Sequence, residues 1–412
     1  TVLDDNKTLC LSNSERIKLP TTLHMMFEVQ DLRVASPATV SRCGMVFMEQ
    51  VYIGTGSLVK TWGETVLTQL LPDQTDDIVA MIEAHLDAGL AYIREFCREI
   101  IPSNDHNLTQ SLLNLLACVL DPERGLDLEN PNLELVIKQY FVWAYTWIIG
   151  GNIHDKTRPG FSEWFIKRFR PMFDDAPQVF DAYCEDIYGF IVHPETATFR
   201  SWESVMDHFA FDEAQPYFSI LVPTEDTTRF NHLLDLMMNG SFNMLFSGET
   251  GVGKSVIMQG FLDRMAQTDR FVSYTMNFSA QTKPENLKDV FETKLEKKRK
   301  TLLGPPSGKK MLFFIDDLNM PFVEEYGTQT PISLLRQYMD YNAWYDRGDL
   351  SVKRIIQDVQ FVTAMNNKSG SFFINPRLQR HFSTFACQMP SDSDLQTIYG
   401  AILESHLGTF RQ

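Results

Sequence analysis

Residues 248–255 read GETGVGKS, a glycine-rich stretch that ends in a lysine and a serine. A strand-like apolar run precedes it and a helical pattern follows, which is the context that a phosphate-binding loop requires and that disfavours a chance glycine-rich turn. The glycines let backbone N–H groups converge on phosphate oxygens, the lysine can reach the β- and γ-phosphates, and the serine can bind Mg²⁺. We therefore predict a site for ATP or ADP with Mg²⁺. Its candidate residues are Gly248, Glu249, Thr250, Gly251, Val252, Gly253, Lys254 and Ser255.

The stretch LFFIDD at 312–317 reads as a buried strand that ends in two carboxylates, Asp316 and Asp317. Ligands of parallel sheets bind beyond the carboxyl ends of the strands, and Mg²⁺ beside phosphates is held through carboxylates and water. We predict that Asp316 belongs to the magnesium shell together with Ser255. The competing interpretation is a polar cap on a core strand.

A further apolar run, DVQFVTAMN at 358–366, ends in Asn366. A neutral amide at the same edge of the sheet can orient an attacking water or contact the γ-phosphate. The alternative is a turn-forming asparagine, because the next residues read NKSG.

The composition limits what such a site can serve. The chain has 412 residues, enough for two or three domains, and its net charge of −16 with a pI near 5.0 argues against a nucleic-acid surface. The longest apolar stretch, residues 140–151, is too short to cross a bilayer, so we expect no membrane partner. The six cysteines show no CxxC spacing and read as free thiols of a soluble, intracellular protein.

The elements that must position the site are read from hydrophobic periodicity. Residues 23–29 and 44–48 read as strands on either side of a short helix at 36–40, and four segments between 57 and 150 carry helical spacing. Asn107 is the predicted N-cap of the third of these helices. Residues 151–225 read as loop-rich with one hairpin, the basic run 294–300 as a solvated helix face, and the part from about 226 onward as alternating helices and strands around a parallel sheet.

The two ends of the chain share a pattern. Arg42 follows Glu28 at the same spacing as Arg380 follows Asn366, each arginine precedes a strand-like run, and a proline lies between in both copies. The repeat indicates that the chain holds the end of one module and most of the next.

Taken together, ASPATVSRCGMVFME, GETGVGKS, FFIDDLNMP and INPRLQRHF resemble the AAA+ modules of dynein heavy chains, and of the axonemal type most of all. The resemblance implies an α/β fold: an AAA+ P-loop NTPase large subdomain with a parallel sheet and flanking helices, preceded by a helical small subdomain and a partial α/β subdomain. The implied boundaries are 1–55 for the end of the second module's large subdomain, 56–175 for its small subdomain, 176–214 for a linker and 215–412 for the third module's large subdomain.

The resemblance also implies roles. Arg42 would reach the first module's nucleotide and Arg380 the second's, with Arg377 as the alternative to Arg380; a surface salt bridge is the simpler interpretation of each. Glu28 stands where a neutral residue is usual, and we assign it no catalytic role. The implied protein is a fragment of a ciliary or flagellar microtubule motor of the axonemal cytoskeleton. Its partners would be neighbouring ring modules, with intermediate chains, light chains and microtubules bound through regions outside this sequence.

In the AAA+ pattern the acidic strand ends Asp-Glu, with the glutamate activating water. Here Asp317 takes that position with a side chain shorter by one C–C bond, about 1.5 Å. A general base must lie within hydrogen-bond reach of its water. The sequence therefore predicts a third site that binds nucleotide, hydrolyses it slowly or not at all, and regulates the motor. The alternative is a structural ring segment with a permanently bound nucleotide.

Overall fold

The computed structural model of the chain describes residues 2–3, 6–29, 31–209, 211, 220–325, 327–346, 348–368 and 374–410. It divides into two compact units, Thr1–Gly54 and Thr55–Gln412. Each unit is described by itself below.

The first unit contains one short antiparallel hairpin and two single-turn helices. The elements are β1 (Thr8–Cys10), β2 (Arg16–Lys18), α1 (Pro37–Val40) and α2 (Gln50–Ile53). Ser36 caps α1 by accepting from the backbone N–H of Thr39, which confirms the helix predicted at 36–40.

The strands predicted at 23–29 and 44–48 are wrong, because both segments are irregular in the structure. Their apolar side chains face outward, with Met26 97% exposed and Val46 85% exposed. A strand needs hydrogen-bonded neighbours, and among the described residues of this unit β1 and β2 are the only strands. The apolar pattern was identified, but neither segment pairs with the β1–β2 hairpin, which is the only sheet among the described residues of this unit.

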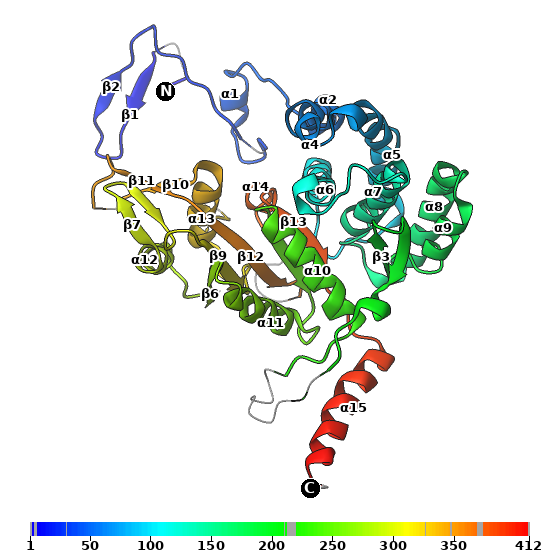
Figure 1. Ribbon diagram of the computed structural model, residues 1–412. Coiled ribbons are helices and arrows are strands. Elements are labelled where there is room, and N and C mark those ends of the chain that lie inside the picture. The colour runs from blue at the N-terminus through cyan, green and yellow to red at the C-terminus, as the bar shows by residue number, and fades with distance from the viewer. Residues whose placement is uncertain are drawn as a thin grey trace. The chain divides into compact units, whose positions relative to one another are not determined.

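The second unit begins with a helical part, here called the lid (residues 55–205), seen in light blue to green in Figure 1. Its elements are α3 (Gly56–Trp62), a π-helix η1 (Gly63–Leu67), α4 (Thr68–Leu70), η2 (Pro72–Gln74), α5 (Thr75–Phe96), α6 (Asp105–Val119), η3 (Pro122–Arg124), α7 (Leu133–Ile149), η4 (Asp155–Thr157), α8 (Arg158–Phe169), η5 (Arg170–Phe173), α9 (Pro177–Tyr183), β3 (Phe190–His193), β4 (Thr198–Ser201) and η6 (Trp202–Val205). All four predicted helical segments and the predicted hairpin are confirmed.

Helix α7 is the centre of the lid, and its side chains are buried nearly all round. The β3–β4 hairpin packs on it, since the Trp143 indole donates to the Phe190 carbonyl (3.1 Å) and the Gln139 amide donates to the Ala197 carbonyl (3.0 Å). Residues 190–201 are thus folded onto the lid helices. The boundaries proposed at 175 and 214 stay predictions.

The N-cap of α6 is Asn104 and not Asn107. The Asn104 side chain accepts from the backbone N–H of Asn107 at 2.7 Å, so the helix begins one turn earlier than predicted. Asn107 is 4% exposed, and its amide donates to main-chain carbonyls from the far end of the chain.

The second part of the unit is a five-stranded parallel sheet in the order β13-β5-β12-β9-β6. The elements are α10 (Glu225–Asn239), β5 (Asn243–Gly248), α11 (Lys254–Gln267), β6 (Phe271–Asn277), α12 (Pro284–Lys294), β9 (Lys310–Asp316), α13 (Thr330–Tyr341), β12 (Val359–Asn366), α14 (Pro376–Gln379), β13 (Phe382–Ala386) and α15 (Asp392–Thr409). The α/β fold class is confirmed.

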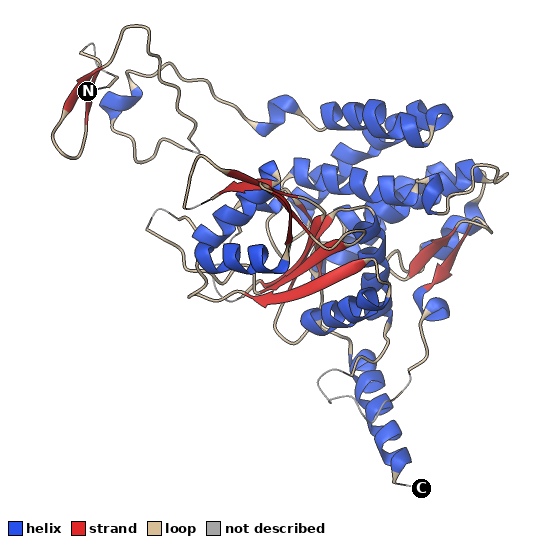
Figure 2. Ribbon diagram, turned by 60° about the vertical axis from the view of Figure 1, so that its left-hand side comes forward, coloured by secondary structure: helices blue, strands red, loops and turns tan. Residues whose placement is uncertain are grey.

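Alternate residues of each strand enter different cores. On β9, Leu312 and Phe314 join α10, α11 and the lid in one hydrophobic cluster, whereas Phe313 and Ile315 join α12 and α13 in another. Helices therefore cover both faces of the sheet, as Figure 2 shows, and α15 extends away from it. Burial on both faces explains why these strands read as continuous apolar runs in the sequence.

A second, four-stranded sheet in the order β10-β11-β8-β7 lies beside α12 and α13 and was not predicted. Its strands are β7 (Glu296–Arg299), β8 (Leu302–Gly304), β10 (Ala343–Tyr345) and β11 (Lys353–Ile356). The helix predicted over 294–300 is wrong beyond Lys294, since β7 pairs antiparallel with β8. Strand β7 carries mostly exposed charges and the other three strands have only three or four residues each, so the sequence lacks the apolar alternation that indicates a strand.

The lid and the sheet share a continuous core and a hydrogen-bonded seam. The backbone N–H of Ala386 donates to the Gly151 carbonyl (3.0 Å), and the Gln388 amide donates to the Ile153 carbonyl (2.9 Å). None of the six cysteines forms a disulfide, as predicted. Within the described ranges, every helix falls short of the length and apolar character that a bilayer span requires.

Candidate nucleotide-binding site

The phosphate loop joins β5 to α11 at the carboxyl edge of the sheet. Gly251 and Gly253 have φ values of 91° and 85°, which only glycine adopts without strain, and α11 starts at Lys254. The loop therefore turns sharply and presents the N-terminus of a 14-residue helix to the space above the sheet. The predicted strand, loop and helix are confirmed.

Gly248 is required for a different reason than Gly251 and Gly253, because there is no room for a side chain at its position. A Cβ atom built on Gly248 would lie 2.4 Å from the carbonyl oxygen of Cys387. That oxygen belongs to a backbone anchored to β5, because the Cys387 N–H donates to the Ser247 carbonyl (2.8 Å). The chain that leaves β13 thus passes directly against the start of the loop.

Ser255 and Asp316 meet although they are far apart in the sequence. The Ser255 hydroxyl donates to Oδ2 of Asp316 at 2.5 Å, bringing a hydroxyl and a carboxylate oxygen to one point at the start of α11. Hard oxygen donors of this kind are the ligands that Mg²⁺ prefers beside phosphates. The residues present therefore fit the magnesium ion that the motif implies.

Lys254 is folded onto its own loop. Its ammonium donates to the carbonyls of Gly248 (3.0 Å) and Glu249 (2.7 Å), and the residue is 8% exposed. Burial lowers the pKa of Lys254, and the nearby carboxylates of Asp316 and Asp317 counteract part of that effect. A phosphate group would offer this buried ammonium a charged partner in place of two neutral carbonyls.

Asn366 ends β12 opposite the phosphate loop. Its Nδ2 donates to the hydroxyl of Thr250, and its backbone carbonyl accepts from the side chain of Asn319 (2.9 Å). The Oδ1 of Asn366 accepts from the backbone N–H of Lys368 (2.9 Å), so both polar atoms of the side-chain amide are hydrogen-bonded, one of them to the loop. The prediction that it senses or orients groups at the γ-phosphate stays a prediction.

Asp317 follows directly on β9 with a left-handed backbone, φ 54°. Aspartate and asparagine tolerate this region better than most other residues, because a short polar side chain can hydrogen-bond locally. Burial raises the pKa of Asp317, the Asp316 carboxylate raises it further, and Lys254 acts in the opposite direction. The Asp317 carboxylate therefore differs from that of Asp316, which accepts from Ser255, although the two are adjacent in the chain.

The three candidate arginines are all exposed. Arg380 follows α14 and donates to Oδ1 of Asp340 on α13 at 2.5 Å, with its side chain 57% exposed. Arg377 is also exposed, on α14 itself. Arg42, in the first unit, is exposed and donates to the Ala38 carbonyl (2.8 Å). Such exposed positions are compatible with a role toward another module.

Two residues of this region were not identified from the sequence. Lys368 lies two positions beyond Asn366 and pairs with Glu249 of the phosphate loop at 2.5 Å. Asp340 accepts hydrogen bonds from both Arg380 and His381, and these outweigh the effect of burial and lower its pKa. A basic residue so soon after Asn366 was a signal for Lys368, whereas nothing in the sequence around Asp340 pointed to Arg380.

Comparison with known proteins agrees with this geometry. Residues 209–390 match the family model of the P-loop containing dynein motor region, and residues 78–204 match that of the dynein heavy chain AAA lid domain. The chain is 41% identical over its whole length to human dynein axonemal heavy chain 6. It is 37% identical over 99% of its length to the ciliary dynein beta chain of Heliocidaris crassispina, and 36% identical over the same share to mouse dynein axonemal heavy chain 17.

The chain spans about a tenth of the length of these curated relatives: 10% of the human protein, 9% of the Heliocidaris crassispina protein and 9% of the mouse protein. The matches together account for the lid, the parallel sheet and the phosphate loop. The chain belongs to the dynein heavy chain family, and its matched relatives are of the axonemal and ciliary type.

Proposed function

We propose that the phosphate-loop site is the third nucleotide site of an axonemal dynein motor ring, and that it binds ATP or ADP with Mg²⁺ to regulate the motor. The observation that carries this proposal is the meeting of Ser255 and Asp316 at 2.5 Å beside a glycine loop that opens a helix. Two residues 61 positions apart come together where a magnesium-bound phosphate needs oxygen ligands.

Each residue around the loop has a role in this proposal. The loop N–H groups and the α11 N-terminus bind the phosphates, and Lys254 exchanges its carbonyl partners for β- and γ-phosphate oxygens. Ser255 and, through water, Asp316 hold Mg²⁺, which when bound neutralises charge on the phosphates. Asn366 would contact the γ-phosphate or the attacking water.

Asp317 is the reason to propose slow or absent hydrolysis at this site. The carboxylate is about 1.5 Å shorter in reach than a glutamate. Its left-handed backbone, φ 54°, is one that aspartate tolerates better than glutamate. Binding depends on the loop and on Mg²⁺, so a misplaced general base leaves affinity intact.

Asp317→Asn should therefore change little in an intact motor. A working general base contributes about 10²–10⁴-fold to a rate, and we expect steady-state ATP turnover to change by less than about twofold. Microtubule-stimulated ATPase activity is the measurement. A large loss of turnover traced to this site would show that Asp317 is an active base.

The alternative is a structural segment in which the nucleotide acts as a fixed staple, stabilising the ring by mass action. The rate of nucleotide exchange separates the two functions. A regulatory site exchanges its nucleotide as the motor changes state, whereas a staple holds it through many motor cycles. Release of a preloaded labelled nucleotide, chased with unlabelled ATP, measures that rate.

The flanking parts complete the proposal. Residues 1–55 and 56–175 would finish the second module, 176–214 would link it to the third, and 215–412 would form the third module's large subdomain. Arg380, or Arg377 in its place, would stabilise charge on the second module's nucleotide, and Arg42 would do so for the first. This arrangement would let nucleotide state pass between neighbouring modules.

The place of action follows from the relatives, which are named as axonemal or ciliary dyneins. We propose that the whole protein works in the axonemal cytoskeleton of a cilium or flagellum. Its partners would be microtubules and the intermediate and light chains, bound through regions beyond this sequence.

A further inference from the structure

Helix α14 carries Arg377 and is followed at once by Arg380, yet it has only four residues, Pro376–Gln379. A helix of one turn is not stable by itself. The direction in which the two arginines leave the backbone must therefore be fixed by contacts from outside α14. Leu378 and Gln379 are buried and give the helix one anchored side.

The lid supplies hydrogen bonds to the backbone around α14. The amide nitrogen of Asn107, in the first turn of α6, donates to the carbonyls of Gln379 (3.2 Å) and Phe382 (3.0 Å). These two carbonyls bracket Arg380 and His381. One buried amide thus fixes the backbone on both sides of the candidate arginine.

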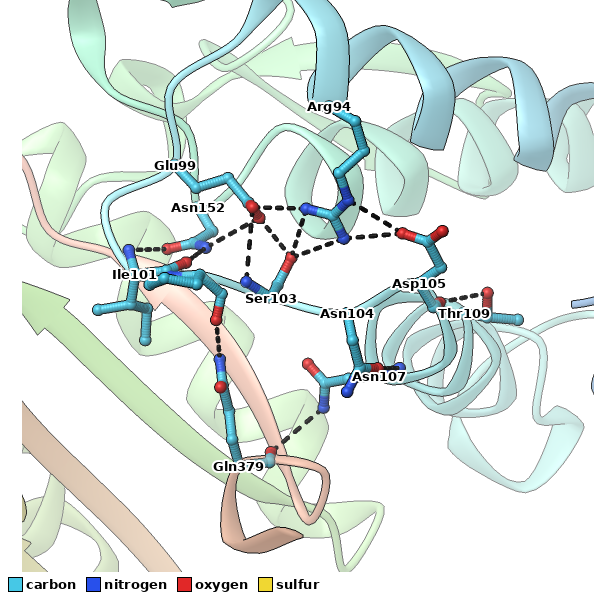
Figure 3. Close-up of polar contacts among 11 residues, drawn as sticks. Arg94, Glu99, Ile101, Ser103, Asn104, Asp105, Asn107, Thr109, Asn152 and Gln379 are labelled. Atoms are coloured by element: carbon cyan, nitrogen blue, oxygen red, sulfur yellow. Dashed lines mark hydrogen bonds and ion pairs between the residues drawn. The ribbon is translucent and has the colours of Figure 1, made fainter. Parts of the chain in front are cut away.

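A second contact holds α14 from its side chain. The Gln379 amide donates to the Pro102 carbonyl (2.9 Å) in the loop between α5 and α6. Asn107, Pro102 and Gln379 are called the clamp below. Figure 3 shows Asn107 and Gln379 facing each other from the lid and from the chain around α14.

The lid side of the clamp is itself braced. Arg94, near the end of α5, pairs with Glu99 (2.5 Å) and with Asp105 at the start of α6 (2.8 Å). The Asn152 amide donates to the Ile101 carbonyl (2.6 Å), so the loop that carries Pro102 is tied on both sides (Figure 3). The lid residues of the clamp are therefore held in place by ion pairs and hydrogen bonds of their own.

Hydrogen bonds matter here because apolar packing is incomplete. A cavity of about 90 Å³ lies between the 101–104 loop, Met365 and Pro376. Contacts across a void are lost, so α14 depends more on its polar partners. Met365, which lines this cavity, directly precedes Asn366 in the sequence.

We propose that Asn107 is a positioning residue for Arg380: the lid sets the placement of the arginine that acts on the second module's nucleotide. This inference rests on the proposed trans role of Arg380. Asp340 completes the arrangement, because its carboxylate holds the Arg380 guanidinium at 2.5 Å from the α13 side. The lid fixes the backbone and Asp340 fixes the side chain.

The test uses Asn107→Asp in the intact motor domain. The change keeps the side-chain shape but removes the donor and places carboxylate oxygens against two carbonyls. The matched control is Asn114→Asp on the same helix, where the side chain accepts from Gln110 (2.9 Å) and keeps that bond as a carboxylate. Gln379→Glu, which removes the donor to Pro102, is a second variant if Asn107→Asp fails to fold.

Two measurements distinguish a role of Asn107 in positioning Arg380 from a general effect on stability. Hydrogen exchange of residues 376–386 should accelerate at least about tenfold in Asn107→Asp, as expected for a loss of about 1.4 kcal/mol, and should not change in Asn114→Asp. Release of a fluorescent nucleotide from the second module, with the other phosphate loops inactivated, should accelerate as in Arg380→Ala. The double variant Asn107→Asp/Arg380→Ala should be no faster than Arg380→Ala alone.

Unchanged exchange in Asn107→Asp, or in Gln379→Glu, would overturn the clamp. Faster exchange without faster nucleotide release, while Arg380→Ala does accelerate release, would overturn positioning. If Arg380→Ala itself has no effect on release, the trans role fails and the functional part of the inference falls with it, and hydrogen exchange still decides whether the clamp exists.

Discussion

Replacing Lys254 by alanine is expected to lower the affinity of the phosphate-loop site for MgATP by on the order of 10²-fold or more. Lys254 is 8% exposed and its ammonium donates to the Gly248 and Glu249 carbonyls, so it is already at the loop when phosphates arrive. Charge-assisted hydrogen bonds are about twice as strong as neutral ones, and alanine supplies none. Labelling of the 248–267 peptide by a photoreactive ATP analogue in the intact motor measures binding at this site alone.

Lys310→Ala is the matched control for this experiment. Lys310 opens β9 at the opposite end from Asp316, and its ammonium donates to the Ser241 hydroxyl at 2.6 Å. It removes a hydrogen-bonded lysine from the same sheet without touching the phosphate loop. Equal losses of labelling in both variants would mean that the effect is one of stability and not of phosphate binding.

Gly248→Ala is expected to weaken nucleotide binding by about 10–100-fold, since forcing an extra carbon into a packed region costs about 1–3 kcal/mol. The added Cβ would lie 2.4 Å from the Cys387 carbonyl, a backbone atom that cannot rotate away. Either the loop or the chain after β13 must shift. The same photolabelling assay, followed as a function of ATP analogue concentration, gives the change in affinity.

Gly400→Ala is the control for a change from glycine to alanine as such. Gly400 lies inside α15, and a Cβ built there has no neighbour within 4 Å. Alanine favours helix over glycine, so this variant should bind nucleotide normally. Unaltered affinity in Gly248→Ala would show that the seam between β5 and Cys387 does not constrain the phosphate loop.

The sequence was most informative where a local pattern carries a physical requirement. The phosphate loop needs glycines at fixed positions, and β9 and β12 are buried on both faces, so both the loop and the strands that flank it could be predicted. The family resemblance then supplied the order of the parts. Asp316 and Asn366 were placed at strand ends because apolar runs stop there.

The failures come from features that no short stretch encodes. Residues 23–29 have a strand's composition, but a strand forms only where a neighbouring strand is present to pair with it. The N-cap of α6 was misplaced by one turn because Asn104 and Asn107 are both good caps and only the fold shows which is used. Lys368 with Glu249, and Arg380 with Asp340, pair across long sequence separations that one sequence does not reveal.

Sequence and structure give separate reasons to expect slow hydrolysis at Asp317. The sequence shows a shortened acid at the position of the water-activating residue, and the structure adds a left-handed backbone that suits aspartate. The two observations support one proposal, a site that binds its nucleotide and hydrolyses it slowly or not at all.

Cryo-electron microscopy of the intact motor domain, frozen during steady-state turnover in saturating MgATP, tests that proposal most directly. We expect a nucleotide between residues 248–255, Asp316 and Asn366 in every class of particles, whatever the state of the first module. A loop that is empty at saturating MgATP, with Lys254 still on the Gly248 and Glu249 carbonyls, would refute nucleotide binding. Classes of particles in which the γ-phosphate of this nucleotide is lost in step with the first module's cycle would refute slow hydrolysis.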